Sequence, residues 1–359
     1  MPYGTVNADS LVSSDGGVIS PNINSLRNRI INGAMVIDQR NAGASISVSS
    51  NTGNQFGADR FLVQGTSAEG VFSAQQLSAT PPTGFKNYVR IQTTTASASP
   101  ASGSLYAMSQ IIEGFNIADL GFGAAGASTV TFSFWIRSSL TGTFSGSLKN
   151  GNSYNRSYPF TYSISSANTW EYKTVTVAGD TTGTWQTGNL GGLIVYWDLG
   201  CGSSLLSTAN SWQAGNFNGV TSSTRLISTL NATMDITGVQ LEKGSTATSF
   251  DYRPYGTELA LCQRYYQRNF NPSYAGIGTA STAVVIPRMS VIMRAAPTVS
   301  ALATANIDLF GVGSANAGTT VFDFITTTGF RAYYGGMSGS SFGQPGNLTN
   351  DAIQASAEL

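Results

Sequence analysis

Short runs in which apolar and polar residues alternate are the feature that most limits how this chain can fold. In the clearest run, residues 128–139 (STVTFSFWIRSS), every second residue is apolar: Val130, Phe132, Phe134 and Ile136. A period of two places these side chains on one face of a β-strand and their neighbours on the other. Further strands are predicted at 28–43, 57–65, 86–95, 104–114, 157–165, 170–180, 191–200 and 233–244. Turns of Gly, Asn, Ser or Pro separate them, which predicts an all-β chain built on an antiparallel sandwich.

Four parts follow from this pattern. Residues 1–27 are polar and aperiodic, so we expect an arm or attachment segment. Residues 28–253 form one large sandwich domain. Residues 254–271 hold the one run of helix formers, and 272–359 return to strand patterns in a smaller distal β-domain.

The helical run, TELALCQRYYQR, stands alone in a chain that otherwise avoids helices. Thr257 is the predicted N-cap, Glu258 suits the first turn, and Pro272 would stop the helix. An apolar stripe follows the helical period and comprises Leu259, Leu261, Cys262, Tyr265 and Tyr266. A helix this short is marginal alone, so the stripe must pack on its own sandwich or on copies of itself.

The charge balance excludes several classes of function. Charged residues make up 10% of the chain, well below the roughly 25% of ordinary soluble proteins, and the formal net charge is zero. No basic stripe exists to neutralise phosphates, so nucleic acid is not an expected partner. No run of 18 apolar residues occurs, so membrane insertion is not expected either. The N-terminus lacks the pattern of a secretory signal, which predicts synthesis in a cytoplasm.

The sequence offers little catalytic chemistry. It contains no histidine, which removes Ser-His-Asp and Cys-His catalysis and the commonest zinc ligand. Cys201 and Cys262 lack metal spacing, and synthesis in a reducing compartment does not favour a disulfide between them. Glycoside cleavage needs two carboxylates, and the 18 acidic residues are scattered singly; Asp198 and Glu242 could approach each other if their strands are neighbours. We therefore expect no enzyme, no cofactor and no metal site; no acidic loop demands calcium.

Binding surfaces are easier to predict, because sugars are held by aromatic faces beside amide and charged side chains. The first candidate is a polar and aromatic face on one sheet, made by Trp135, Arg137, Tyr196, Asp198, Gln240 and Glu242. In the competing interpretation Trp135 is core and Arg137 pairs with Glu242 or Asp198. The alternatives are loop platforms at Trp185 and Trp212, and a distal loop tip at Arg331, Tyr333 and Tyr334.

Several of these stretches also resemble a known family. They are INGAMVIDQRN, ADRF, TFSFWIRSS, TWEYKTVTVAGDTTGTW, MRAAPTVS and, most specifically, residues 237–268 with ELALCQRYY. Together they resemble tail-fibre and receptor-binding proteins of tailed bacteriophages over most of residues 28–300. The resemblance implies a jelly-roll like that of carbohydrate-binding modules, and a homotrimeric fibre whose distal domain follows the helix.

The function implied is that of a non-catalytic virion protein that attaches to host surface polysaccharide. It would be assembled in the host cytoplasm and act outside the cell, docked to other tail or baseplate proteins through its N-terminal segment. In a trimer, the helix stripe would pack around the shared axis. Two alternatives stay open: a capsid-associated fibre or decoration protein, and a polysaccharide depolymerase.

Overall fold

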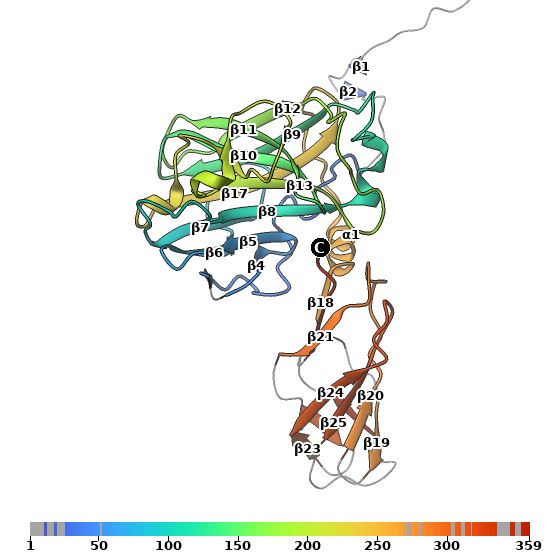
Figure 1. The fold of residues 1–359 in the computed structure, drawn as a ribbon. Helices are drawn as coiled ribbons and strands as arrows, with labels where there is room; N and C mark the ends of the chain where they lie inside the picture. The colour runs from blue at the N-terminus through green and yellow to red at the C-terminus, as the bar shows by residue number, and fades with distance from the viewer. Residues whose placement is uncertain are drawn as a thin grey trace, which may run out of the picture.

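The computed structural model describes residues 11–12, 18–19, 26–50, 52–268, 270, 274–279, 282–302, 306–309, 313–316, 318–335, 345–348 and 353–359. The fold is all-β with one α-helix, and its main body is a jelly-roll sandwich of two antiparallel sheets (Figure 1). No helix in the described part of the chain is long and apolar enough to cross a membrane.

The first sheet of the sandwich has seven strands. In spatial order they are β15 (Gln213–Ala214), β11 (Arg156–Ile164), β10 (Gly142–Asn150), β13 (Gly191–Asp198), β8 (Tyr106–Glu113), β5 (Phe61–Gly65) and β4 (Gln55–Ala58). The second sheet has six, in the order β12 (Glu171–Val177), β9 (Val130–Ser138), β17 (Thr233–Lys243), β7 (Tyr88–Thr95), β6 (Val71–Leu77) and β3 (Ile46–Val48).

Several short elements precede or connect these strands. They are the pairs β1 (Leu11–Val12) with β2 (Val18–Ile19) and β14 (Leu206–Ser207) with β16 (Gly219–Val220), and the 3-10 turns Gly114–Asn116, Ala118–Leu120, Ser203–Leu205 and Leu226–Ser228. The pair of β14 and β16 is parallel.

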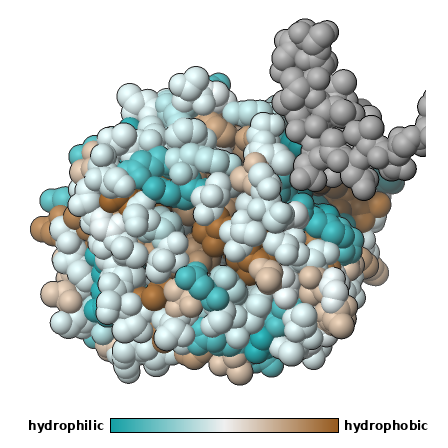
Figure 2. Space-filling model, turned by 90° about the horizontal axis from the view of Figure 1, so that it is seen from above, coloured by the Kyte–Doolittle hydropathy of each residue, from teal (hydrophilic) through white to brown (hydrophobic). Residues whose placement is uncertain are grey.

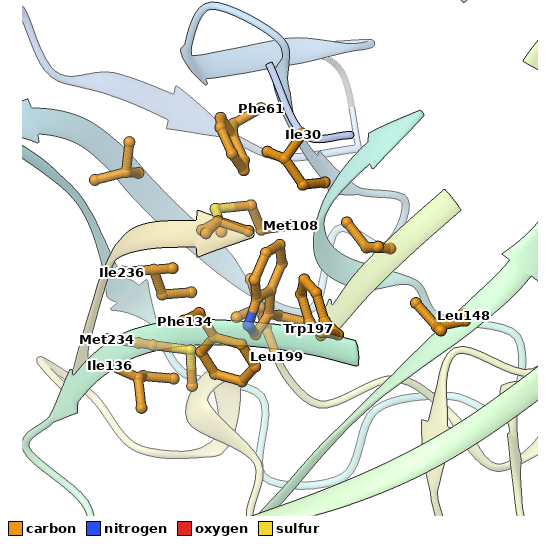
Figure 3. Packing of buried hydrophobic residues seen from close by; sticks show 14 of the residues in the cluster. Ile30, Phe61, Met108, Phe134, Ile136, Leu148, Trp197, Leu199, Met234 and Ile236 are labelled. Carbon is orange, nitrogen blue, oxygen red and sulfur yellow. The ribbon is translucent and has the colours of Figure 1, made fainter. Parts of the chain in front are cut away.

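The core lies between the two sheets, where the inward residues of each alternating run meet. The four apolar residues predicted on one face of β9 are all fully buried, which confirms the strand and its orientation. Trp197 of β13 sits among them, with its ring centroid 5.3 Å from that of Phe132 and 5.5 Å from that of Phe134. Figure 3 shows this packing, with Trp197 between Met108, Phe134 and Leu199. Burying each such side chain contributes about 1.5 to 3 kcal/mol.

The outer surface matches the low charge of the sequence. Figure 2 shows one face of the molecule, mostly of intermediate hydropathy, with small separate patches that are strongly polar or strongly apolar. The small extent of the strongly polar patches agrees with the charged fraction of 10% in the sequence.

The segment 28–43 is not the strand that the sequence predicts. Ile30, Met35 and Ile37 are buried, but turns carry them there, and both Asn32 and Met35 have left-handed backbone angles. The Asn32 side chain replaces the missing strand partners, because its amide donates to Ile37 O at 2.8 Å and accepts from Ile37 N. The apolar pattern therefore predicted burial correctly and the type of element wrongly.

The helix α1 spans Tyr255–Gln263, shorter than predicted. Its N-cap is Pro254 rather than Thr257, and Glu258 N donates to Pro254 O at 3.1 Å. Residues Tyr266–Arg268 leave the helix to form β18, which pairs with β27 (Ile353–Ser356). A strand edge was available there, and hydrogen bonding to it replaces the last helical turn.

A three-stranded sheet joins the sandwich to the distal domain. Its order is β18, β27 and β21 (Thr298–Ala301). The chain leaves the sandwich through β18 and returns through β27, and the C-terminus lies beside α1 (Figure 1). Ala357 N donates to Tyr265 O at 2.8 Å, which ties the end of β27 to the start of β18. Arg294 donates to Asn189 O at 2.6 Å, which ties the segment before β21 to the sandwich.

The distal domain is a seven-stranded sheet that hangs below this junction (Figure 1). Its strands, in spatial order, are β23 (Gly313–Asn316), β22 (Asn306–Leu309), β26 (Pro345–Leu348), β19 (Tyr274–Thr279), β20 (Thr282–Val285), β25 (Arg331–Gly335) and β24 (Thr319–Asp323). The predicted loop tip at GFRAYYGG is therefore wrong for residues 331–335, which lie inside the sheet as β25. Pro272 lies outside the described residues.

Candidate functional site

A cleft lies on the outer face of the seven-stranded sheet of the sandwich. The alternation of side chains along each strand decides which of them reach it. On β10, Phe144 and Leu148 point into the core, so Ser147 and Lys149 point outward. On the neighbouring β13, Trp197 points inward and Tyr196 outward. Ser147 is paired directly with Tyr196 across the two strands. The pleat thus brings a basic and an aromatic side chain together on one surface.

The cleft has a volume of about 380 Å³, within the range of sites that hold small ligands. Its apolar side is formed by Leu62, Leu105, Ile111, Leu205 and Leu359. Its other side chains are polar or aromatic: Asn54, Gln64, Thr66, Lys149, Tyr154, Tyr196, Asn216 and Asn218. No aspartate or glutamate lines it.

Lys149 is the basic group of the cleft, and it is only 1% exposed. Its ammonium donates to Asn216 Oδ1 at 2.5 Å and to Asn218 Oδ1, and it lies 4.1 Å from the centre of the Tyr196 ring. No carboxylate among the described residues forms an ion pair with it. Burial lowers the pKa of Lys149 to about 7, because the charged form is poorly solvated there.

The two asparagines reach Lys149 from the loop between β15 and β16, which the sheet holds in place. Phe217 N donates to Ser157 Oγ at 3.0 Å, and Asn218 N donates to Leu205 O at 2.7 Å. Gly215 has a φ of +133°, and a Cβ there would meet the Phe217 ring at 2.5 Å. The glycine is thus required for the bend that brings both amides over the sheet.

Tyr154 overhangs the cleft from the turn between β10 and β11. It is 40% exposed and has a φ of 51°, an unusual backbone angle for a bulky residue. The turn is held by Asn150, whose side-chain oxygen accepts from both Asn155 N and Arg156 N at 3.0 Å. The centre of the Tyr154 ring lies 5.7 Å from the Lys149 ammonium, so an exposed aromatic face borders the cation.

The residues predicted to share one sheet do not do so. Tyr196 and Asp198 lie on β13 of the seven-stranded sheet, whereas Trp135, Arg137 and Gln240 lie on β9 and β17 of the other. The alternation showed which residues face outward but not from which sheet. Of this set only Tyr196 lines the cleft.

Asp198 and Glu242 are buried and fully engaged. Asp198 accepts from Gly200 N at 2.8 Å and from Cys201 N at 2.7 Å, and Glu242 accepts from the Thr248 hydroxyl at 2.7 Å. They belong to different sheets, so they do not form the carboxylate pair that glycoside cleavage would need. Among the described residues, no group of three or more potential ligands could hold a metal ion.

Arg137 and Gln240 have structural partners on the six-stranded sheet. Arg137 pairs with Asp235 at 2.7 Å, an acid other than the two that we predicted, and Gln240 donates to Glu242. Trp135 contacts the Tyr172 ring at 5.4 Å and borders a second hollow of about 400 Å³. Besides Trp135 and Tyr172, that hollow is lined by Phe85, Phe250, Ser133, Gly238 and residues 247–249, without a charged group.

The two loop tryptophans support each other instead of forming open platforms. The ring of Trp185 lies 5.4 Å from that of Trp212, and both contact Phe122. Their indole nitrogens donate to backbone oxygens, Trp185 to Thr182 and Trp212 to Ala178. This aromatic cluster extends the core at one end of the sandwich.

In the distal domain, Tyr334 is fully buried and Tyr333 is half-buried. Arg331 makes a bidentate ion pair with Asp323 and lies 4.7 Å from the Tyr333 ring centre. A hollow of about 500 Å³ lies beside Arg331 and the exposed Phe324. Tyr333 and Tyr334 do not line it.

Three of the five residues predicted to mediate self-association are buried within the chain. Cys262, Tyr265 and Tyr266 are at most 2% exposed, while Leu259 and Leu261 are half-buried. The helix packs on Ile31 and Ile37 of its own sandwich, which is the alternative that the sequence left open. The predicted packing of these three residues around a shared axis is therefore wrong.

The sequence prediction missed Lys149, Tyr154, Asn216 and Asn218. Residues 142–150 (GTFSGSLKN) carry a period of two that puts Lys149 opposite Leu148, but their Gly and Ser content is typical of turns. The asparagines lie in a loop whose path depends on contacts far away in the sequence. No local pattern could have placed them beside Lys149.

Comparison with known proteins gives a limited result. No protein-family model matches the sequence, and no curated protein matches it. Among solved structures, a putative sugar-binding protein from Bacteroides thetaiotaomicron is similar at a TM-score of 0.34 and 11% identity, over 60% of this chain and 100% of that chain. The carbohydrate-binding module TmCBM61 in complex with beta-1,4-galactotriose is similar at a TM-score of 0.27 and 9% identity. That match covers 51% of this chain and 88% of the module.

The enzymatically active domain of tailspike protein 4 from bacteriophage CBA120 is similar at a TM-score of 0.30 and 11% identity. The match covers 61% of this chain and 22% of the tailspike chain. Because all these identities are below 25% and the TM-scores are below 0.5, we base the proposed function on the cleft itself.

Proposed function

We propose that this protein binds a glycan in the cleft around Lys149, Tyr154 and Tyr196. The observation that carries the proposal is the composition of the cleft: an exposed tyrosine face, an ammonium and several side-chain amides around one concave surface. Aromatic faces pack against the C–H surface of a sugar ring, while amides and cations bind its hydroxyls. No aspartate or glutamate of the described residues lines the cleft to protonate a leaving group, so the proposed activity is binding without cleavage.

We further propose that the protein is a bacteriophage tail fibre that attaches to host surface polysaccharide as a homotrimer. The resemblance of residues 28–300 to that family supports this role. A slimmer distal domain lies beyond the junction from the sandwich (Figure 1). This arrangement, with the cleft on the sandwich, also suits a fibre that reaches towards a surface. Three weak cleft sites on one particle would gain avidity.

Glycan binding is tested with the full-length protein on a glycan array and by competition with phage adsorption to host cells. Tyr154→Ala removes the exposed ring and should weaken binding about tenfold, the effect of one aromatic contact of 1 to 2 kcal/mol. Tyr172→Ala is the matched control, since Tyr172 is 42% exposed on the opposite sheet. Binding lost with Tyr172→Ala and retained with Tyr154→Ala would move the site to the second hollow and refute the cleft.

The fibre and the absence of cleavage have separate tests. Sedimentation at micromolar concentration should give three copies; a compact single subunit would contradict the homotrimer. Incubation with host polysaccharide should release no new reducing ends. Release of new reducing ends by the highly purified protein would identify a depolymerase instead.

A further inference from the structure

Among the residues that the structure describes, Lys149 differs from the other deeply buried basic side chains in forming no ion pair with an aspartate or glutamate. Arg60 pairs with Glu358, and Arg253 pairs with Glu258 at 3.2 Å. Lys149 is at least as buried as either, yet its hydrogen-bond partners among the described residues are the neutral amides of Asn216 and Asn218. A buried cation is costly unless an anion compensates it. The wall of the cleft thus holds a positive charge for which the described residues supply no aspartate or glutamate partner.

We infer that the glycan carries a carboxylate, as in a uronic or ulosonic acid, and that this carboxylate binds Lys149. The inference rests on the proposed glycan-binding function. Asn216 is exposed, so its amide can turn away and leave its place on the ammonium to a carboxylate oxygen. The exposed face of Tyr154, 5.7 Å from the ammonium, then packs against the sugar ring.

The surroundings of the cleft favour an anion. The titratable side chains around Lys149 are Tyr154, Tyr196 and the Cys201 thiol. Burial raises the pKa of both Tyr196 and Cys201, so these two keep their protons near pH 7. No aspartate or glutamate side chain among the described residues lines the cleft to repel a carboxylate. Glu358 precedes the lining residue Leu359, but it pairs with both Arg40 and Arg60.

A carboxylate ligand makes binding depend on pH in a defined direction. Burial sets the pKa of Lys149 near 7 in the free protein, so most clefts hold the ammonium at pH 6 and few hold it at pH 8. If the acidic sugar binds only when Lys149 is protonated, its affinity falls about tenfold between pH 6 and pH 8. A neutral sugar gains nothing from the charge, and its affinity changes little over the same range.

The experiment uses matched oligosaccharides on an array and in solution: acidic sugars and their methyl esters, which differ only in charge. The full-length protein should bind at least one acid about tenfold more tightly than its ester at pH 6, and lose that preference at pH 8. Lys149→Met should lose the preference at both pH values, and Lys149→Arg should keep it without the pH dependence. Tyr172→Ala should behave as wild type.

Each contrary result has a definite meaning. Equal binding of acid and ester, still weakened by Tyr154→Ala, would overturn the inference and leave the proposed function standing. A preference for sulfated over carboxylated sugars would also overturn it. Glycan binding that is unchanged in Tyr154→Ala would show that the cleft is not the glycan site. If Lys149→Met does not fold, the pH dependence of the acid-to-ester ratio in the wild type decides the question.

Discussion

The ammonium of Lys149 lies 4.1 Å from the centre of the Tyr196 ring, on the neighbouring strand of the same sheet. A cation over a desolvated aromatic ring gains about 2 kcal/mol. Two amide oxygens add charge-assisted hydrogen bonds from the loop above. These contacts reduce the cost of burying the charge but do not remove it, because burial still lowers the pKa of Lys149 to about 7.

The first prediction concerns stability and pH. The folded pKa of Lys149 lies below its unfolded value, so between them the unfolded chain binds more protons and stability rises with pH. From pH 7 to pH 8 the free energy of unfolding should rise by about 1 kcal/mol from this group. Urea denaturation of the isolated protein at each pH measures it.

The control is Lys149→Met, in which this rise should be absent. Burial raises the pKa values of the Cys201 and Cys262 thiols, so these groups lower the free energy of unfolding above about pH 8. They do so equally in the wild type and in the variant. The difference between wild type and variant therefore isolates Lys149. Identical pH profiles of the two proteins would mean that Lys149 keeps an ordinary pKa.

A second prediction concerns Asp235, which pairs with two arginines on the six-stranded sheet. It is 1% exposed and accepts from Arg90 and from Arg137, each at 2.8 Å. Asp235→Ala leaves both guanidinium groups without their acid, so we expect a loss of about 3 kcal/mol in the free energy of unfolding. Asp119→Ala is the comparison, because the Asp119 side chain also pairs with an arginine, Arg29, but is 48% exposed. Its loss should stay under about 1 kcal/mol, and equal losses would contradict the argument.

The sequence predicted the strands better than it predicted their neighbours. The period of two identified β9, β7, β8, β11, β12, β13 and β17 within a few residues, because alternation is a local property. It could not assign β9 and β13 to opposite sheets, since strand pairing is decided by contacts across the whole domain. Trp135 and Tyr196 were therefore both correctly placed on outward faces and wrongly placed together.

The candidate site was only partly predictable for the same reason. Tyr196 followed from the pattern of its own strand. Lys149 lies on a strand whose glycines and serines resemble a turn, and Asn218 reaches it from a loop almost 70 residues further on, through contacts of that loop with β11. The left-handed turn at Tyr154 depends on the Asn150 side chain, which no propensity scale describes.

A third prediction concerns the two thiols. Cys201 and Cys262 are free and at most 1% exposed, and burial raises the pKa of both well above its usual value. Only the thiolate reacts with disulfide reagents, so neither cysteine should react in the native protein at pH 8. Both should react in 6 M guanidinium, as counted with a chromogenic aromatic disulfide. Rapid reaction of one thiol without denaturant would show that its segment opens.

The last prediction concerns Glu113, the acid that joins the sandwich to the chain beyond α1. Glu113 ends β8, is 1% exposed, and accepts from Arg264 at 2.7 Å and from the Tyr265 hydroxyl at 2.8 Å. Burial raises the pKa of Tyr265 to about 12, so the phenol keeps its proton and donates at neutral pH. Both bonds fasten the residues that lead into β18, and β18 carries the distal domain.

Glu113→Ala should therefore loosen the junction while the sandwich stays folded, at a cost of about 3 kcal/mol for the uncompensated arginine. Trypsin should then cut after Arg264 or Arg268 faster than in the wild type, and small-angle scattering should show a broader range of particle lengths. Tyr265→Phe removes one hydrogen bond and keeps the ion pair, so its effect should be about 1 kcal/mol. If Glu113→Ala leaves both cleavage and scattering unchanged, the junction is held instead by Arg294 and its bonds to Asn189 and Ala357.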